Sequence, residues 1–171
     1  MGRIEVICGS MFSGKTEELI RRINKVEKTN LKYMVFKPEI DTRNKKNSIK
    51  SHNNIEIPAQ SVNNVVDILN YKNKFDVIAI DEAQFLKKKQ IKQISTIVDD
   101  FDIPVLTFGI RTDFQGKLFE GSKYLLAWAD NIKEIKTICW CGRKATMIVR
   151  VSEDGKIVEE GDQILIGGNE T

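Results

Sequence analysis

The stretch IEVICGSMFSGKT, residues 4–16, decides the fold of this chain. Its second part, Gly9 to Thr16, matches the pattern G-x-x-x-x-G-K-[ST] of a phosphate-binding loop. That pattern carries weight only between a strand and a helix, and both flanks fit. Ile4 to Cys8 has the apolar composition of a buried strand, and apolar residues recur at helical spacing after Gly14. The stretch therefore predicts a strand, a phosphate loop and a helix, in that order.

The chemistry of phosphate binding explains the spacing within the loop. Glycines let the backbone curl so that N–H groups point at phosphate oxygens, and the positive end of the following helix adds a partial charge. Lys15 supplies a cation for the β- and γ-phosphates, and Thr16 offers a hydroxyl to the magnesium ion that bridges them. The loop alone thus predicts binding of a nucleoside triphosphate with Mg²⁺.

An acidic strand end supplies the second half of such a site. Residues 75–82, FDVIAIDE, form an apolar run that ends in Asp81 and Glu82. An acid in this position holds the magnesium ion directly or through water. Because neighbouring side chains at a strand end diverge, we expect Asp81 to serve the metal and Glu82 to face a substrate as general base.

The rest of the chain alternates between strand-like and helical patterns, which favours an α/β fold with a mostly parallel sheet. The predicted strands are Ile4 to Cys8, Leu31 to Phe36, Phe75 to Ile80 and Val105 to Ile110. Four helices are predicted. The first begins near Gly14 and buries Leu19, Ile20, Ile23 and Val26; the second is capped by Ser61 and carries Val62, Val65, Val66 and Leu69; the third carries Ile91, Ile94, Ile97 and Val98; the fourth carries Tyr124, Leu125 and Trp128.

Two segments depart from this alternation. The polar run DTRNKKNSIKSHNN, residues 41–54, predicts a mobile excursion. From Ile132 onward the helical spacing disappears, and 146–151 and 156–166 resemble strands joined at Asp154-Gly155. We therefore predict a nucleotide-binding core over residues 1–131 and a small β subdomain over residues 132–171.

Composition limits the function. The chain has 171 residues, 41% of them apolar, and a net charge of +3, which is too small a basic bias for a dedicated nucleic-acid binder. The apolar runs are strand-sized, so we expect no membrane segment and a cytoplasmic location. Of the three cysteines, Cys8 fits a core strand, while Cys139 and Cys141 are too close for an easy mutual disulfide.

One competing motif is out of place. Asn73-Lys74-Phe75-Asp76 spells the N-K-x-D string with which GTPases read guanine. In a GTPase that string follows a strand and comes after the metal-binding acid, whereas here it precedes Asp81. We therefore interpret it as a polar helix end.

Five ordered segments resemble the thymidine kinases of the animal cytosolic and bacterial type. They are GSMFSGKTEELIRR (9–22), KPEIDTR (37–43), IDEAQF (80–85), GIRTDFQGKLF (109–119) and CGRKATMIVR (141–150) followed by IGGNE (166–170). The resemblance covers nearly the whole chain. It implies transfer of the γ-phosphate of ATP to the 5′-hydroxyl of thymidine, giving dTMP, by a RecA-like α/β core with a small zinc-ribbon-like β subdomain, in a homotetramer.

The resemblance also implies roles for single residues. Glu82 matches the catalytic base, Asp81 and Thr16 match the magnesium side, and Asp41 and Arg43 match a segment near the phosphates. The residues implied to bind ATP are Gly9, Ser10, Met11, Phe12, Ser13, Gly14, Lys15, Thr16, Asp81, Glu82, Ala83 and Gln84. The residues implied to surround the nucleoside are Met11, Phe85, Ile110, Phe114 and Phe119. Leu165, Ile166 and Gly167 match the loop whose main chain hydrogen-bonds the thymine edge.

Cys139 and Cys141 resemble the first half of the family's structural zinc site. A closed zinc site has four protein ligands, and the resemblance places the other two beyond Thr171. Either the chain continues past that residue or the site is degenerate.

Two other functions share some of these features. An ATPase that acts on a protein or nucleic-acid partner would have the same loop and Asp81, but it gives no reason for the segment GIRTDFQGKLF. A nucleic-acid-binding module built on the cysteines would need a basic stripe, and the sequence has none.

Overall fold

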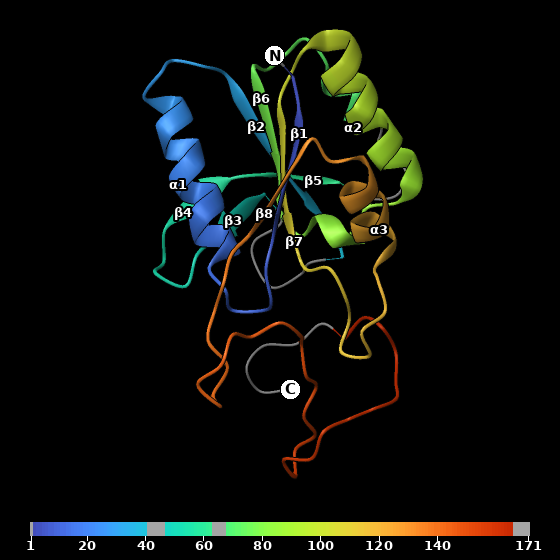
Figure 1. Cartoon of the computed structure of the whole chain (residues 1–171). Helices are drawn as coiled ribbons and strands as arrows, with labels where there is room; N and C mark the ends of the chain where they lie inside the picture. The colour runs from blue at the N-terminus through green and yellow to red at the C-terminus, as the bar shows by residue number, and fades with distance from the viewer. Residues whose placement is uncertain (1, 41–46, 63–67, 166–171) are drawn as a thin grey trace.

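The computed structural model describes residues 2–40, 47–62 and 68–165 (Figure 1). Its strands are β1 (Ile4–Cys8), β2 (Tyr33–Pro38), β3 (Ser48–Lys50), β4 (Glu56–Pro58), β5 (Gln60–Val62), β6 (Val77–Ile80), β7 (Val105–Gly109) and β8 (Asn131–Glu134). Its helices are α1 (Lys15–Glu27), α2 (Lys88–Phe101) and α3 (Glu120–Trp128), with short 3₁₀ turns η1 (Ile68–Tyr71) and η2 (Ala83–Phe85). None of the described helices has both the length and the apolar character needed to cross a membrane.

The main sheet of the described residues has the strand order β5-β2-β6-β7-β1-β8. Every neighbouring pair in it is parallel. All its strands therefore end at the same edge, where α/β proteins bind their ligands. This arrangement confirms the predicted fold class.

Helices cover both faces of the sheet (Figure 1). On β1, Ile4 and Val6 face the core cluster that α2 and α3 complete, whereas Ile7 faces the cluster that contains Leu19 of α1. Burying each such side chain contributes roughly 1.5–3 kcal/mol. The alternating faces of β1 thus fix the two helical layers.

Three of the four predicted helices are confirmed. The first begins directly after Gly14, whose φ of 85° lies in the left-handed region that glycine adopts without strain. Leu19, Ile20 and Ile23 are buried as expected, and Val26 is half-buried. The third and fourth helices correspond to α2 and α3.

The predicted second helix is wrong at its start. Ser61 does not cap a helix; it lies in β5, which pairs with β2 at the edge of the sheet. Val62 is 1% exposed there, and its β-branched side chain suits a strand. Val65 and Val66 lie outside the described residues, and Leu69 belongs to the short turn η1.

The prediction of a mobile excursion is wrong for its second part. β3 and β4 form an antiparallel hairpin, and their Ile49 and Ile57 are buried in the cluster beneath α1. The buried Lys37 of β2 donates from Nζ to the carbonyl oxygen of Ser48 at 2.7 Å. These buried contacts hold the hairpin against the core, although most of the residues around it are polar. Residues 41–46 lie outside the described part.

The C-terminal segment also differs from the expectation. β8 joins the main sheet beside β1, so the sheet continues past residue 131. Beyond it, the described residues contain isolated bridges, Ile138 to Lys144 and Val151 to Ile157, instead of the predicted strands at 146–151 and 156–166. The turn at Asp154-Gly155 is present, closed by Gly155 N–H and the Ser152 carbonyl. With its apolar side chains largely exposed, this hairpin has no core on which to build regular strands. The two-domain division stays a prediction.

Candidate active site

The carboxyl ends of β1, β7 and β6 form the centre of the candidate site. These strands are neighbours in the sheet, with β7 in the middle. Each leads into a segment that the sequence marks: the phosphate loop after β1, Asp81 to Phe85 after β6, and Ile110 to Phe119 after β7. The C-terminal segment after β8 passes below this same edge (Figure 1).

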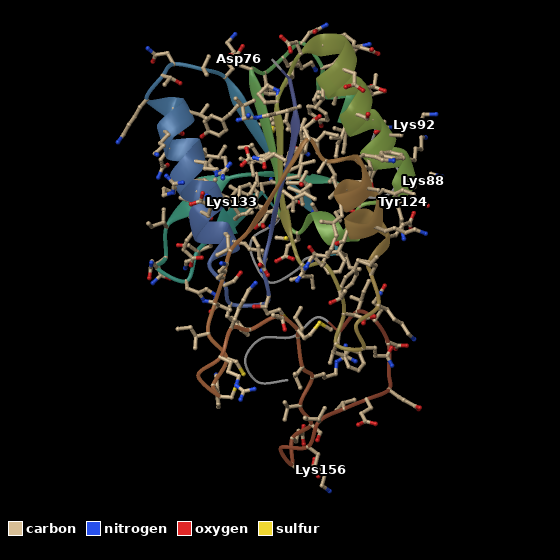
Figure 2. The ribbon with its side chains drawn as sticks, in the orientation of Figure 1. Asp76, Lys88, Lys92, Tyr124, Lys133 and Lys156 are labelled. Atoms are coloured by element: carbon tan, nitrogen blue, oxygen red, sulfur yellow. The ribbon has the colours of Figure 1, made fainter. Side chains whose placement is uncertain are left out.

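The competing N-K-x-D string lies at the other end of the molecule. Asp76 precedes β6, so it belongs to the amino edge of the sheet (Figure 2). Its carboxylate accepts a hydrogen bond from the backbone N–H of Lys32 at 2.7 Å. Asp76 therefore has a structural role, and the string is far from the phosphate loop.

The phosphate loop curls around the ammonium group of Lys15. This side chain is only 8% exposed, and its Nζ donates to the carbonyl oxygen of Ser10 at 2.7 Å and to Ser13 Oγ at 3.5 Å. Phe12 has a φ of 60° and Gly14 a φ of 85°, so both lie in the left-handed region and together bend the loop. A buried cation at the start of α1 gives the loop the positive potential that phosphate binding requires.

Thr16 and Asp81 meet across the site. Thr16 Oγ1 donates to Asp81 Oδ2 at 3.3 Å, and Asp81 Oδ1 accepts from the backbone N–H of Glu82 at 3.0 Å. Asp81 is 6% exposed. The structure thus joins the hydroxyl of one predicted magnesium residue to the carboxylate of the other.

Glu82 turns the chain immediately after β6. Its φ of 49° and ψ of 40° place a non-glycine residue in the left-handed region, which costs roughly 1 kcal/mol or more. The side chain is half-buried, and one of its carboxylate oxygens accepts a hydrogen bond from Gln84 Nε2. This strained residue connects Asp81 directly to η2.

Three residues that the resemblance assigns to the nucleoside cluster beside η2. The rings of Phe85 and Phe119 are 5.7 Å apart at an angle of 87°, and Phe119 is 5% exposed. The backbone N–H of Ile110 donates to Gln84 Oε1 at 3.3 Å. Phe85 and Phe119 thus form an apolar ring contact at the end of β6, and the backbone of Ile110, after β7, is bonded to the same turn.

The other predicted nucleoside residues lie elsewhere or are not described. Met11 is 38% exposed on the phosphate loop, and Leu165 is 59% exposed at the end of the described chain. Phe114 packs against Arg150, whose guanidinium carbon is 3.9 Å from the ring centroid. Ile166 and Gly167, like Asp41 and Arg43, lie outside the described residues.

Asp113 is a residue that the sequence analysis missed. It is 3% exposed, and its carboxylate accepts hydrogen bonds from the backbone N–H groups of Gln115 and Lys117 and from Gln163 Nε2 at 3.0 Å. Burial raises the pKa of Asp113, but these hydrogen bonds outweigh it, so the pKa lies below its ordinary value. The turn at Asp113 was readable from D-F-Q-G, but its bond to Gln163 was not.

A depression beside the phosphate loop was also not predicted. There Arg111 Nη2 lies 3.7 Å from Glu134 Oε1, and Lys144 Nζ lies 2.6 Å from Glu134 Oε2. The hydrogen bond from Lys144 holds the pKa of Glu134 below its ordinary value. The depression is lined by Gly9, Ser10, Ile110, Arg111, Thr112, Glu134, Ala145, Thr146 and Ile148.

Cys139 and Cys141 lie together on an exposed turn. Gly142 N–H donates to the Cys139 carbonyl at 2.8 Å, which closes the turn around both thiols. Hydrogen bonds from the backbone and thiol of Cys141 lower the pKa of Cys139. Among the described residues, no group of three or more His, Cys, Asp or Glu side chains is placed to hold a metal ion.

Comparison with known proteins gives one consistent result. The family model described as thymidine kinase matches residues 2–171. A thymidine kinase of Rhodopirellula baltica is 44% identical over 176 residues, covering 99% of this chain and 83% of the relative. One of Shewanella oneidensis is 43% identical over 177 residues, covering 100% of this chain and 92% of the relative.

Matches among solved structures are weaker. The genome packaging NTPase B204 of Sulfolobus turreted icosahedral virus 2 matches with a TM-score of 0.49 and 17% identity, covering 82% of this chain and 77% of that one. The Legionella pneumophila ATPase DotB matches with a TM-score of 0.46 and 14% identity, covering 84% of this chain and 43% of that one.

Proposed function

The chain belongs to the thymidine kinase family, and from that membership we propose how its residues share the reaction. The protein uses ATP to phosphorylate thymidine, giving dTMP. A bond forms between the 5′-oxygen and the γ-phosphorus, the bond from that phosphorus to the β–γ bridging oxygen breaks, and ADP leaves. The proton of the 5′-hydroxyl must also be removed.

The triphosphate side of the site is the loop from Gly9 to Thr16. We assign the β- and γ-phosphates to its backbone N–H groups and to Lys15, whose buried ammonium group already lies in the concavity of the loop. Thr16 and Asp81 fit a magnesium ion, since hydroxyl and carboxylate oxygens are the ligands it prefers and the two side chains are in contact. A bound Mg²⁺ neutralises charge on the phosphate oxygens.

The acceptor side begins one residue after Asp81. We assign Glu82 as the general base that takes the proton of the 5′-hydroxyl, because it is a half-buried carboxylate next to the metal-side acid. Phe85, Ile110 and Phe119 would provide the apolar wall for the thymine ring. The observation that carries this proposal is the Thr16–Asp81 contact, with Glu82 following at the same sheet edge.

The test is phosphorylation of separate deoxynucleosides by the purified protein with ATP and Mg²⁺. We expect thymidine to give monophosphate at least ten times faster than deoxycytidine or deoxyguanosine. Formation of ADP without any nucleoside monophosphate would favour the alternative, an ATPase that acts on a partner. A Lys15→Ala variant, which we expect to lose phosphate binding, controls for contaminating kinases.

We propose that Cys139 and Cys141 supply two of four ligands to a structural zinc ion. Their exposed thiols share one tight turn, which brings together two residues of the type that structural zinc binds. In a chain that also carries the two further ligands, elemental analysis should find close to one zinc per chain and a large loss in Cys139→Ser. Equal zinc content in both proteins would contradict this role.

We also propose a cytoplasmic homotetramer, on the basis of the family resemblance alone. Light scattering of the purified protein should give the mass of four chains of 19.5 kDa. A monomer mass at micromolar concentration would contradict the assembly.

A further inference from the structure

Gln84 is the most enclosed polar side chain next to the proposed base. It lies in η2, is 3% exposed, and uses both ends of its amide. Nε2 donates to the Glu82 carboxylate, and Oε1 accepts from the backbone N–H of Ile110 at 3.3 Å. A carboxylate only accepts and a backbone N–H only donates, so the two partners fix the orientation of the amide.

The surroundings of Gln84 are built to hold it. A methyl group on Gly109 would lie 2.5 Å from Gln84 Oε1 and 3.2 Å from its backbone nitrogen. A methyl group on Gly121 of α3 would lie 2.4 Å from the Ala83 carbonyl oxygen and 2.8 Å from that of Gln84. β7 and α3 therefore approach η2 as closely as a bare backbone allows, and Gln84 has little room to move.

Glu82 needs such a support. Its long side chain projects from a strained turn and is half-buried, so it could adopt several rotamers. A base must hold its carboxylate within hydrogen-bond reach of one hydroxyl, and a misplacement of about 1 Å can cost roughly 100-fold in rate. The Gln84 amide ties that carboxylate to the end of β7, where Ile110 belongs to the proposed nucleoside wall.

We propose that Gln84 is a positioning residue that fixes the Glu82 carboxylate relative to the nucleoside wall. This role rests on the proposed function of Glu82 as the base. It is separate from the ATP contact that the family resemblance implied for Gln84. Gln84 acts through Glu82 and takes no proton itself.

The test combines two changes at Gln84 with a change at Glu82. Gln84→Met keeps the length of the side chain and removes both polar ends, whereas Gln84→Glu keeps an acceptor for Ile110 N–H and removes the donor to Glu82. At pH 8 we expect each variant to lower kcat by about 10- to 100-fold. The KM for ATP should stay within about threefold, because the Gln84 side chain is 3% exposed and both ends of its amide are bonded within the protein.

A double-mutant cycle separates positioning from general damage. If Gln84 works through Glu82, Gln84→Met should change the residual rate of Glu82→Gln by less than about twofold, because no base remains to be positioned. If Gln84→Met instead damaged the fold, it would lower the rate by the same factor in the wild type and in Glu82→Gln. That equal loss, or full kcat in Gln84→Glu, would overturn the inference while leaving Glu82 as the base.

The chain offers a matched control in Gln93. This α2 residue is 7% exposed, and its Oε1 accepts from the backbone N–H of Ile68 in η1 at 3.0 Å. Gln93→Met should lower the unfolding temperature as Gln84→Met does, yet leave kcat within about twofold. If Glu82→Gln itself keeps the wild-type rate, the base assignment fails, and the role of Gln84 fails with it.

Discussion

At the scale of single residues, the proposed phosphoryl transfer depends on Glu82. We expect Glu82→Gln to lower kcat by about 100- to 10,000-fold, because a neutral amide cannot take the proton of the 5′-hydroxyl. The affinity for ATP should change little, since Lys15 and the loop backbone are untouched. Steady-state kinetics and titration of ATP measure the two effects. An unchanged kcat would remove Glu82 from the role of base.

The sequence was a good guide to residues within local motifs. The loop from Gly9 to Thr16 and the acids at the end of β6 were located because their meaning depends on nearby residues. The bonds of Gln84 to Ile110 and of Asp113 to Gln163 join residues 26 and 50 positions apart. No local pattern encodes such a contact, so both had to come from the structure.

At the scale of elements, the hairpin of β3 and β4 is part of the core. We expect Ile49→Ala to lower the free energy of unfolding by about 2–4 kcal/mol, because the side chain is 2% exposed beneath α1. Denaturation by urea measures the change, with Lys50→Ala on the outer face as the control. A loss below about 0.5 kcal/mol would mean that the hairpin is the mobile segment that its polar composition suggested.

Short elements were the ones that sequence patterns failed to locate. α1 and α2 carry long periodic runs of apolar residues, which make their buried faces readable, and β1 was located by the phosphate loop that follows it. β5 and β3 have three residues each, and they exist because neighbouring strands supply their hydrogen bonds. Tertiary pairing of this kind overrides local preference.

Asp113 joins the turn after β7 to the C-terminal segment. Its pKa is lowered in the folded protein, so its contribution to stability is present above the unfolded pKa and is lost as the pH falls through the folded pKa. Asp113→Asn should therefore reduce stability by about 1–2 kcal/mol at pH 7, and the difference from wild type should shrink in acid. Urea denaturation at several pH values tests this; a difference that is constant down to pH 2 would contradict it.

At the scale of the whole molecule, Glu18 joins α1 to the sheet. Arg22 bonds both Glu18 and the buried Glu5 of β1, and Lys133 of β8 lies 3.9 Å from Glu18 (Figure 2). The hydrogen bond from Arg21, opposed by burial and aided by Arg22, lowers the pKa of Glu18 to about 2. Because these pairs are partly exposed, we expect Glu18→Gln to cost about 1 kcal/mol at pH 7.

The pH dependence of the destabilisation by Glu18→Gln follows from the direction in which the pKa of Glu18 is shifted. A lowered folded pKa gives stability above pH 4.5 that is lost as the pH falls towards 2. Thermal unfolding of wild type and Glu18→Gln should therefore converge over this range. A difference in unfolding temperature that widens in acid would contradict the stabilising role of the ion pairs around Glu18.

The most direct measurement of the central claim is the transfer of labelled phosphate from the γ-position of ATP to thymidine. We predict that the wild-type protein forms labelled dTMP in a one-to-one ratio with ADP, and that Glu82→Gln, while binding ATP as tightly, forms dTMP at least about 100 times more slowly. Release of the label as inorganic phosphate, with thymidine unmodified, would contradict the account.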